Sequence, residues 1–139
     1  MAYTYDTENI FAKILRGEIP NDTVLETEHS LAFNDIRPQA PIHVLVIPRG
    51  AYVNYDDFAS NASDAEILDY TRAIARVCEM KGVEADGFRM ISNAGEHGVQ
   101  EVPHLHVHII PRTIGDVPDP RGGVRWVIPH KANYLKGQP

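Results

Sequence analysis

Three histidines at alternate positions, His104, His106 and His108, are the residues of this sequence whose spacing points most directly to chemistry. An aliphatic residue follows each of them. Alternate side chains of an extended strand point to the same face, so the three imidazoles would share one face and the aliphatic chains the other. The pattern predicts a strand with one face in the core and the other in a functional site.

Three interpretations of this histidine face are open from the residues alone. The first is structural, with three hydrogen-bonded or solvent-facing histidines on a half-exposed strand. The second is a zinc site, because three imidazoles can form a catalytic zinc centre. Alternate residues of a strand lie about 7 Å apart, however, and no fourth ligand or supporting carboxylate is obvious nearby. The third is catalysis by imidazole itself, which needs neither a metal nor a cofactor, and we expect this one.

Two helices are predicted to support the histidine strand. An amphipathic pattern at residues 7–16, which ends at Gly17, predicts a short N-terminal helix. A longer helix is predicted at residues 64–81, where Ser63 and Glu66 form a capping box and Gly82 provides the stop.

Short apolar runs predict the strands of a sheet at residues 24–26, 31–33, 42–47, 88–92 and 105–110. Residues 43–49 and 106–112 resemble each other, since each begins with histidine and ends with proline and arginine after an apolar run. Neighbouring positions in one sheet would explain that likeness. A sheet with two helices is an α+β fold.

Length and composition predict one domain over residues 1–139, with the triad-bearing core at about 9–112 and a tail at 113–139 that contains Trp126. Cys78 is the only cysteine, which excludes an intrachain disulfide and favours a reducing compartment, so we expect a cytoplasmic protein. A formal net charge of −6 argues against a nucleic-acid polymer as partner. No signal peptide or membrane span is expected, and no membrane partner.

Several further segments carry a resemblance to a known family. Residues 104–110 have the pattern His-x-His-x-His with apolar residues between, and residues 10–20, 32–43 and 91–95 match in order and spacing. Together they resemble the Hint-like branch of the histidine triad (HIT) family, the purine nucleoside phosphoramidase type. The resemblance extends from about Asn9 to Arg112.

The resemblance implies a fold and an activity. The fold is an antiparallel sheet in a two-fold homodimer, with the helix at 63–81 and the strand at 88–92 as the expected interface. The activity is cleavage of a P–N or P–O bond at the α phosphorus of a purine nucleotide conjugate, such as a nucleoside phosphoramidate or an acyl-adenylate. A covalent nucleotidyl-histidine forms, and a nucleoside monophosphate is released. The alternatives are a nucleotide-binding or regulatory module with little turnover and a dinucleoside polyphosphate hydrolase.

The resemblance also implies the catalytic residues. His106 is the expected nucleophile, since a neutral imidazole can attack phosphorus and split one displacement into two easier ones. His104 and His108 would donate hydrogen bonds to the phosphate or orient His106. His43 would join them from the neighbouring strand.

A nucleotide-binding surface is implied in the same way, for a substrate such as an AMP conjugate. Asp35 would accept hydrogen bonds from the ribose hydroxyls, as a carboxylate offers acceptors only. The other implied contacts are the base-pocket residues Ile10, Phe11, Ile14 and Phe33, then Ile36 beside Asp35, and finally Asn93, Val99, Gln100 and Glu101 near the phosphate and leaving group.

Two positions of this surface depart from the eukaryotic pattern of the branch, which has glycine at the position of Val99 and serine at that of Glu101. A backbone amide contact from residue 99 survives the first change. An ionised carboxylate at residue 101 would repel a phosphate, so we expect a changed role in leaving-group protonation and a changed substrate preference.

Overall fold

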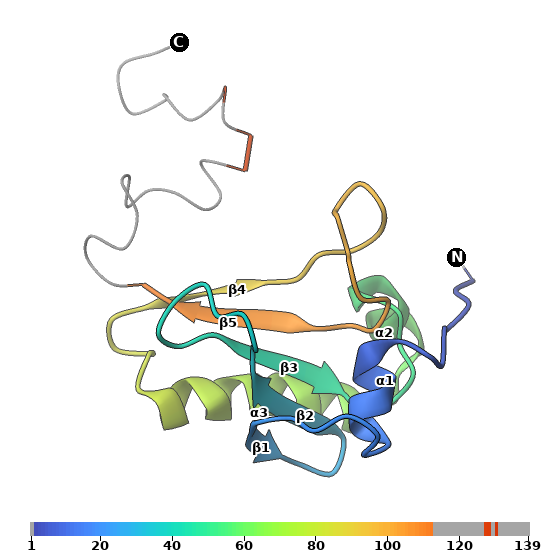
Figure 1. The fold of residues 1–139 in the computed structure, drawn as a ribbon, viewed down its shortest axis with the longest axis horizontal. Coiled ribbons are helices and arrows are strands. Elements are labelled where there is room, and N and C mark those ends of the chain that lie inside the picture. The colour runs from blue at the N-terminus through green and yellow to red at the C-terminus, as the bar shows by residue number, and fades with distance from the viewer. Residues whose placement is uncertain (1, 113–126, 129, 131–139) are drawn as a thin grey trace.

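The computed structural model describes residues 2–112, 127–128 and 130, so most of the predicted tail, Trp126 included, lies outside the described residues (Figure 1). An α+β fold is confirmed. Its elements in chain order are α1 (Ile10–Leu15), β1 (Thr23–Glu26), β2 (Ser30–Asn34), β3 (Val44–Pro48), α2 (Tyr55–Asn61), α3 (Asp64–Lys81), β4 (Phe88–Ile91) and β5 (Val107–Pro111).

The strands form one antiparallel sheet in the order β1-β2-β3-β5-β4. The last strand, β5, lies between β3 and β4, with Leu45 opposite His108 and Val44 opposite Ile109. The two similar segments of the sequence are therefore direct neighbours in the sheet, as predicted. β4 forms an edge of the sheet.

Each face of the sheet packs against a different helix. On one side α3 covers a cluster that includes Val46 and Ile109. On the other side α1 contributes Phe11 to a second cluster with Leu45, and Figure 1 shows α1 in front of the sheet and α3 behind it. All five residues of β3 are buried, because this central strand is covered on both faces.

The capping signals of the sequence set the ends of α3. Ser63 accepts from the Glu66 amide while Glu66 accepts from the Ser63 amide, and Gly82 ends the helix in the left-handed region with φ 66°. The N-terminal helix is shorter than predicted, because Asn9 rather than an earlier residue caps it by accepting from the Ala12 amide. The short helix α2, which Asn54 caps, was not predicted from the sequence.

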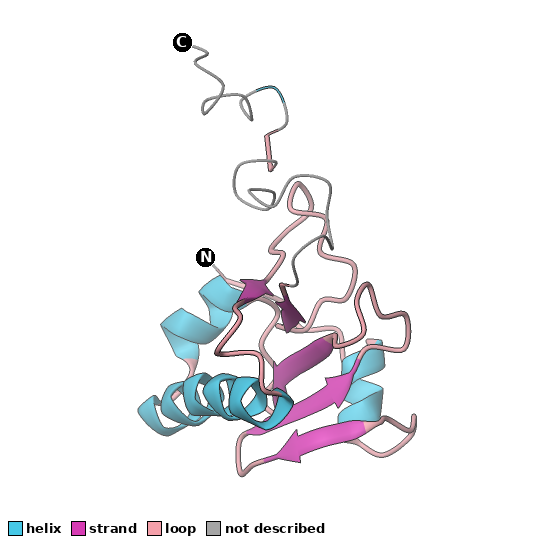
Figure 2. Ribbon diagram, turned by 90° about the vertical axis from the view of Figure 1, so that its left-hand side faces the viewer, coloured by secondary structure: helices cyan, strands magenta, loops and turns pink. Residues whose placement is uncertain are grey.

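The histidine strand is also shorter than predicted. Its ladder begins at Val107, because the amide of His104 bonds to Val102 and the amide of Leu105 bonds to Tyr52. The loop after β4 and the chain leading into β5 thus stand above the end of the sheet near α1 (Figures 1 and 2). Among the described residues, no helix has the length and apolar character needed to cross a membrane.

Candidate active site

The histidine face predicted from the alternation is present. Leu105, Val107 and Ile109 are buried in the cluster covered by α3. The rings of His106 and His108 lie on the opposite side, 5.0 Å apart between centroids. The ring of Phe11, from α1, meets the rings of both His104 and His106 edge-on.

His106 is held as a neutral imidazole in one tautomer. Its Nδ1 lies 2.9 Å from the carbonyl oxygen of His104, so Nδ1 carries the proton that is donated. The lone pair is then on Nε2, for which the described residues provide no hydrogen-bond partner. Burial, at 7% exposure, is the main reason that the pKa of His106 lies below its ordinary value. The hydroxyl of Ser92 donates to the His106 carbonyl at 2.8 Å and fixes the backbone as well.

Of the two roles expected for His104, contact with the phosphate and orientation of His106, its hydrogen bonds favour the second. Its Nε2 donates to the carbonyl oxygen of Pro48 at 2.8 Å, and its Nδ1 accepts from the hydroxyl of Tyr5 at 2.5 Å. Both ring nitrogens are therefore used inside the protein, and burial lowers the pKa of His104 to about 4. His104 acts on the site through its carbonyl group, which orients His106.

His108 and His43 form a directed hydrogen-bond chain. The amide of Gln39 donates to His43 Nδ1 at 3.1 Å, so His43 carries its proton on Nε2. That nitrogen lies 2.9 Å from His108 Nδ1 and 3.5 Å from Asp35 Oδ2. His108 Nδ1 therefore accepts, and its proton is on Nε2, the nitrogen left as a donor. Burial first, and then the nearby His106 and His43, lower the pKa of His108 to about 4.

Asp35, His43 and His108 are also the residues that could hold a metal ion, since their ligand atoms lie within 4.8 Å of one another. The separation of the two imidazole nitrogens, 2.9 Å, suits a shared proton. Two ligands of one tetrahedral zinc ion would lie about 3.3 Å apart. As they stand, the three groups are arranged as a hydrogen-bond chain.

A pocket of about 510 Å³ opens over His106 and His108. Seven of the predicted site residues line it: Phe11, Asp35, Asn93, Val99, Glu101, His106 and His108. Gly98, from the loop that also contains Val99 and Glu101, lines it as well, together with two residues that were not predicted, Leu45 and Val102. Leu45 could have been found, because it lies two positions after His43 on the same strand face.

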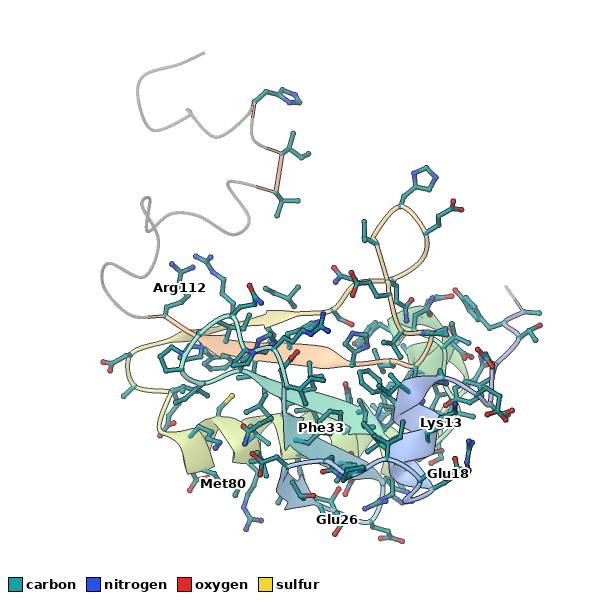
Figure 3. All side chains as sticks on the ribbon, in the orientation of Figure 1. Lys13, Glu18, Glu26, Phe33, Met80 and Arg112 are labelled. Atoms are coloured by element: carbon teal, nitrogen blue, oxygen red, sulfur yellow. The ribbon has the colours of Figure 1, made fainter. Side chains whose placement is uncertain are left out.

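Several predicted base-pocket residues lie elsewhere. Ile14 and Phe33 are buried beneath Phe11 in the second cluster, and Figure 3 shows Phe33 against the sheet beside α1. They support the pocket wall instead of forming it. Ile10 and Ile36 are exposed, Ile36 at 86%, and neither lines the pocket.

Gln100 holds the loop that forms the rim of the pocket. Its side-chain amide donates to the carbonyl groups of Val53 and Val102, and its side-chain oxygen accepts from the Gly95 amide. The loop turns sharply before it, with φ 56° at Val99. Gln100 was predicted to contact the nucleotide. In the structure its side chain instead stabilises the loop through these three hydrogen bonds.

Asp35 both caps a turn and lines the pocket. Its Oδ1 accepts from the Arg37 amide at 2.7 Å and so caps the turn that follows β2. Its Oδ2 faces His43, and the residue lines the pocket. Asp35 and Glu101 are the charged side chains in the pocket lining, which includes no lysine or arginine.

The antiparallel fold and the alternate histidines that open onto one pocket define a protein of the histidine triad type. The family model described as the HIT domain matches residues 16–114, and the chain belongs to the HIT family.

Relatives with this fold include hydrolases. The chain is 59% identical over 109 residues to a 13.2 kDa HIT-like protein of Azospirillum brasilense, covering 78% of this chain and 89% of the relative. It is 42% identical over 103 residues to the purine nucleoside phosphoramidase of Escherichia coli K12, covering 74% and 86%. Among solved structures, a HIT family hydrolase from Clostridium thermocellum is similar, with a TM-score of 0.69, 36% identity and coverage of 76% of this chain and 91% of that one.

Proposed function

We propose that the protein hydrolyses or transfers purine nucleotides by cleaving a P–N or P–O bond at the α phosphorus of a nucleotide conjugate. The substrates would be nucleoside phosphoramidates or acyl-adenylates, and the product a nucleoside monophosphate. The observation that carries this proposal is the fixed tautomer of His106, a residue that lines the pocket and whose Nε2 has no hydrogen-bond partner in the described part of the chain. The phosphoramidase activity named for the E. coli relative supports it.

In the first step, Nε2 of His106 forms a bond to phosphorus while the bond from phosphorus to the leaving group breaks. A leaving amine takes up a proton as it departs. His106 then carries a positive charge, which its Nδ1–H shares with the His104 carbonyl. In the second step, water attacks phosphorus, loses a proton, and breaks the P–N bond to His106. The nucleoside monophosphate leaves, and neutral His106 returns.

The surrounding groups match the charges of this reaction. His108 Nε2–H can donate to an oxygen of the phosphoryl group, where negative charge gathers in the transition state. Its orientation follows from the chain that starts at the Gln39 amide. Asp35 offers acceptors for ribose hydroxyls, and Phe11 provides an apolar wall for a base. Asn93 lines the same pocket, and its side-chain amide could donate to a phosphate oxygen there.

The test is mass spectrometry of protein quenched during turnover of adenosine 5′-phosphoramidate. We expect an AMP adduct on the peptide that contains His106, and loss of both adduct and turnover in His106→Ala. His97→Ala is the matched control, because His97 is exposed and does not line the pocket. Adduct on another residue, or turnover by His106→Ala, would contradict the mechanism. Tight AMP binding without turnover or adduct would instead show a nucleotide-binding module.

The protein also has the features of a homodimer subunit, which we propose to form through α3 and β4. β4 is an edge strand of the sheet that the described residues form, and its Met90 is 56% exposed. An apolar groove of about 530 Å³ lies beside it, lined by Phe88 and Met90 and by α3 residues such as Ile67 and Ile74. Pairing of β4 with its copy would extend the sheet and cover this groove.

A further inference from the structure

Glu101 is held in place at the pocket although it is exposed. The residue before it, Gln100, is fixed by the hydrogen bonds of its side chain to Gly95, Val53 and Val102. The residue after it, Val102, packs against the cluster that contains Phe11. With both neighbours anchored, the backbone at Glu101 is fixed where this residue lines the pocket.

Within the described residues, no group neutralises the charge of Glu101. No hydrogen bond or ion pair joins its side chain to another residue in the described part of the chain, and the pocket lining contains no lysine or arginine. Its field reaches the nucleophile, because the Glu101 charge acts to raise the pKa of His106 against the larger effect of burial. A bound conjugate would therefore meet an unpaired negative charge beside the reacting phosphorus.

The leaving group is the part of the conjugate that meets this charge. The attacking and leaving atoms lie roughly in line at phosphorus, so the leaving group points away from His106 and toward the exposed rim. Val99 and Glu101, both exposed, border the pocket there. An anionic leaving group such as a polyphosphate would be repelled, and a cationic one would be attracted.

We infer that Glu101 determines specificity for the leaving group and selects nucleotide conjugates whose leaving group carries a positively charged amine. This inference rests on the proposed function and defines its substrate class. One charge pair near a protein surface corresponds to a preference of about tenfold.

The test compares two adenosine 5′-phosphoramidates of equal length, one with 1,5-diaminopentane as leaving group and one with hexylamine. The first ends in an ammonium group and the second in a methyl group. We expect kcat/KM to be about tenfold higher for the cationic substrate, and the preference to decrease at high salt. In Glu101→Gln the two values should converge to within about twofold, and in Glu101→Lys the order should reverse.

The matched control is Glu96→Gln, because Glu96 is an exposed carboxylate of the same loop that does not line the pocket. This variant should keep the full preference. Glu101→Gln should also cleave a dinucleoside polyphosphate faster than the unchanged protein does.

The possible outcomes distinguish the role of Glu101 from the proposed function on which it rests. Equal kcat/KM for both substrates in the unchanged protein, or an undiminished preference in Glu101→Gln, would overturn the role of Glu101 and leave the proposed function intact. Failure to turn over either substrate, together with the absence of an adduct on His106, would overturn both.

Discussion

Acidification is expected to destabilise the protein through His104. The ring is fully buried and neutral in the folded state, with one nitrogen donating to Pro48 and the other accepting from Tyr5. Protonation would place a charge in this apolar surrounding, and burial accordingly holds the pKa of His104 at about 4. In the unfolded chain the same side chain titrates near its ordinary value of about 6.5.

The sign and size of the effect follow from these two values. Because the folded pKa is lower, the unfolded chain binds the proton first as the pH falls below about 6.5. The free energy of unfolding then decreases until the pH reaches the folded pKa of about 4. Between pH 7 and pH 5, His104 should account for a loss of about 2 kcal/mol.

Urea denaturation at pH 7, 6 and 5 measures this loss. We expect the unchanged protein to lose about 2 kcal/mol more than His104→Gln over this range, whatever the stability of the variant at pH 7. His106 and His108 also have lowered pKa values, but they contribute to both proteins and cancel in the difference. His97→Gln, at an exposed site, should behave as the unchanged protein does.

An identical pH dependence in His104→Gln and the unchanged protein would refute the reasoning. If the variant does not fold, the imidazole resonance of His104 in the unchanged protein can be titrated by NMR. A midpoint near pH 4 agrees with burial of the neutral ring. A midpoint near 6.5 would show that the ring is accessible to water.

Three further changes have defined expected results. Tyr5→Phe removes the donor to His104 Nδ1 and should lower the free energy of unfolding in urea by about 1–2 kcal/mol; an unchanged midpoint would disprove the contact. Gln100→Leu removes the brace beside Glu101, so the kcat/KM preference for a cationic leaving group should fall although the carboxylate remains, and a preserved preference would speak against positioning by this side chain. Met90→Arg places a charge beside the apolar groove, and sedimentation should show a monomer where the unchanged protein sediments as a dimer; a persistent dimer would place the interface elsewhere.

Local signals allowed much of the fold to be predicted from the sequence. Ser63, Glu66 and Gly82 determine the ends of α3. Each of them forms its capping hydrogen bonds with residues only a few positions away in the sequence. The doubly covered strand β3 was predicted from an unbroken apolar run for a similar reason. By contrast, α2 is a short helix of 7 residues with no long amphipathic pattern, and it was missed.

The site was predictable in its composition and less so in its hydrogen bonds. The alternation correctly predicted that the histidines share one face. The hydrogen bonds of each ring, however, depend on residues that are far away in the sequence. Tyr5 is 99 positions from His104, and Pro48 is 56 positions from it. Packing of the whole domain brings these partners together. They therefore could not be predicted from the spacing of the histidines.

The segment before β1, which includes Tyr5 and α1, determines how far the chain can be shortened at its N-terminal side without disturbing the candidate site. The match to the HIT family begins at residue 16, after both Tyr5 and the whole of α1. A protein shortened to that match would lose the aromatic ring of Phe11 beside His106 and would leave a bare acceptor on His104. The His106 ring would then be exposed to water, on a sheet face that α1 no longer covers. For expression and engineering, we therefore expect the shortest folded unit to begin no later than Tyr5, upstream of the residues that match the family model.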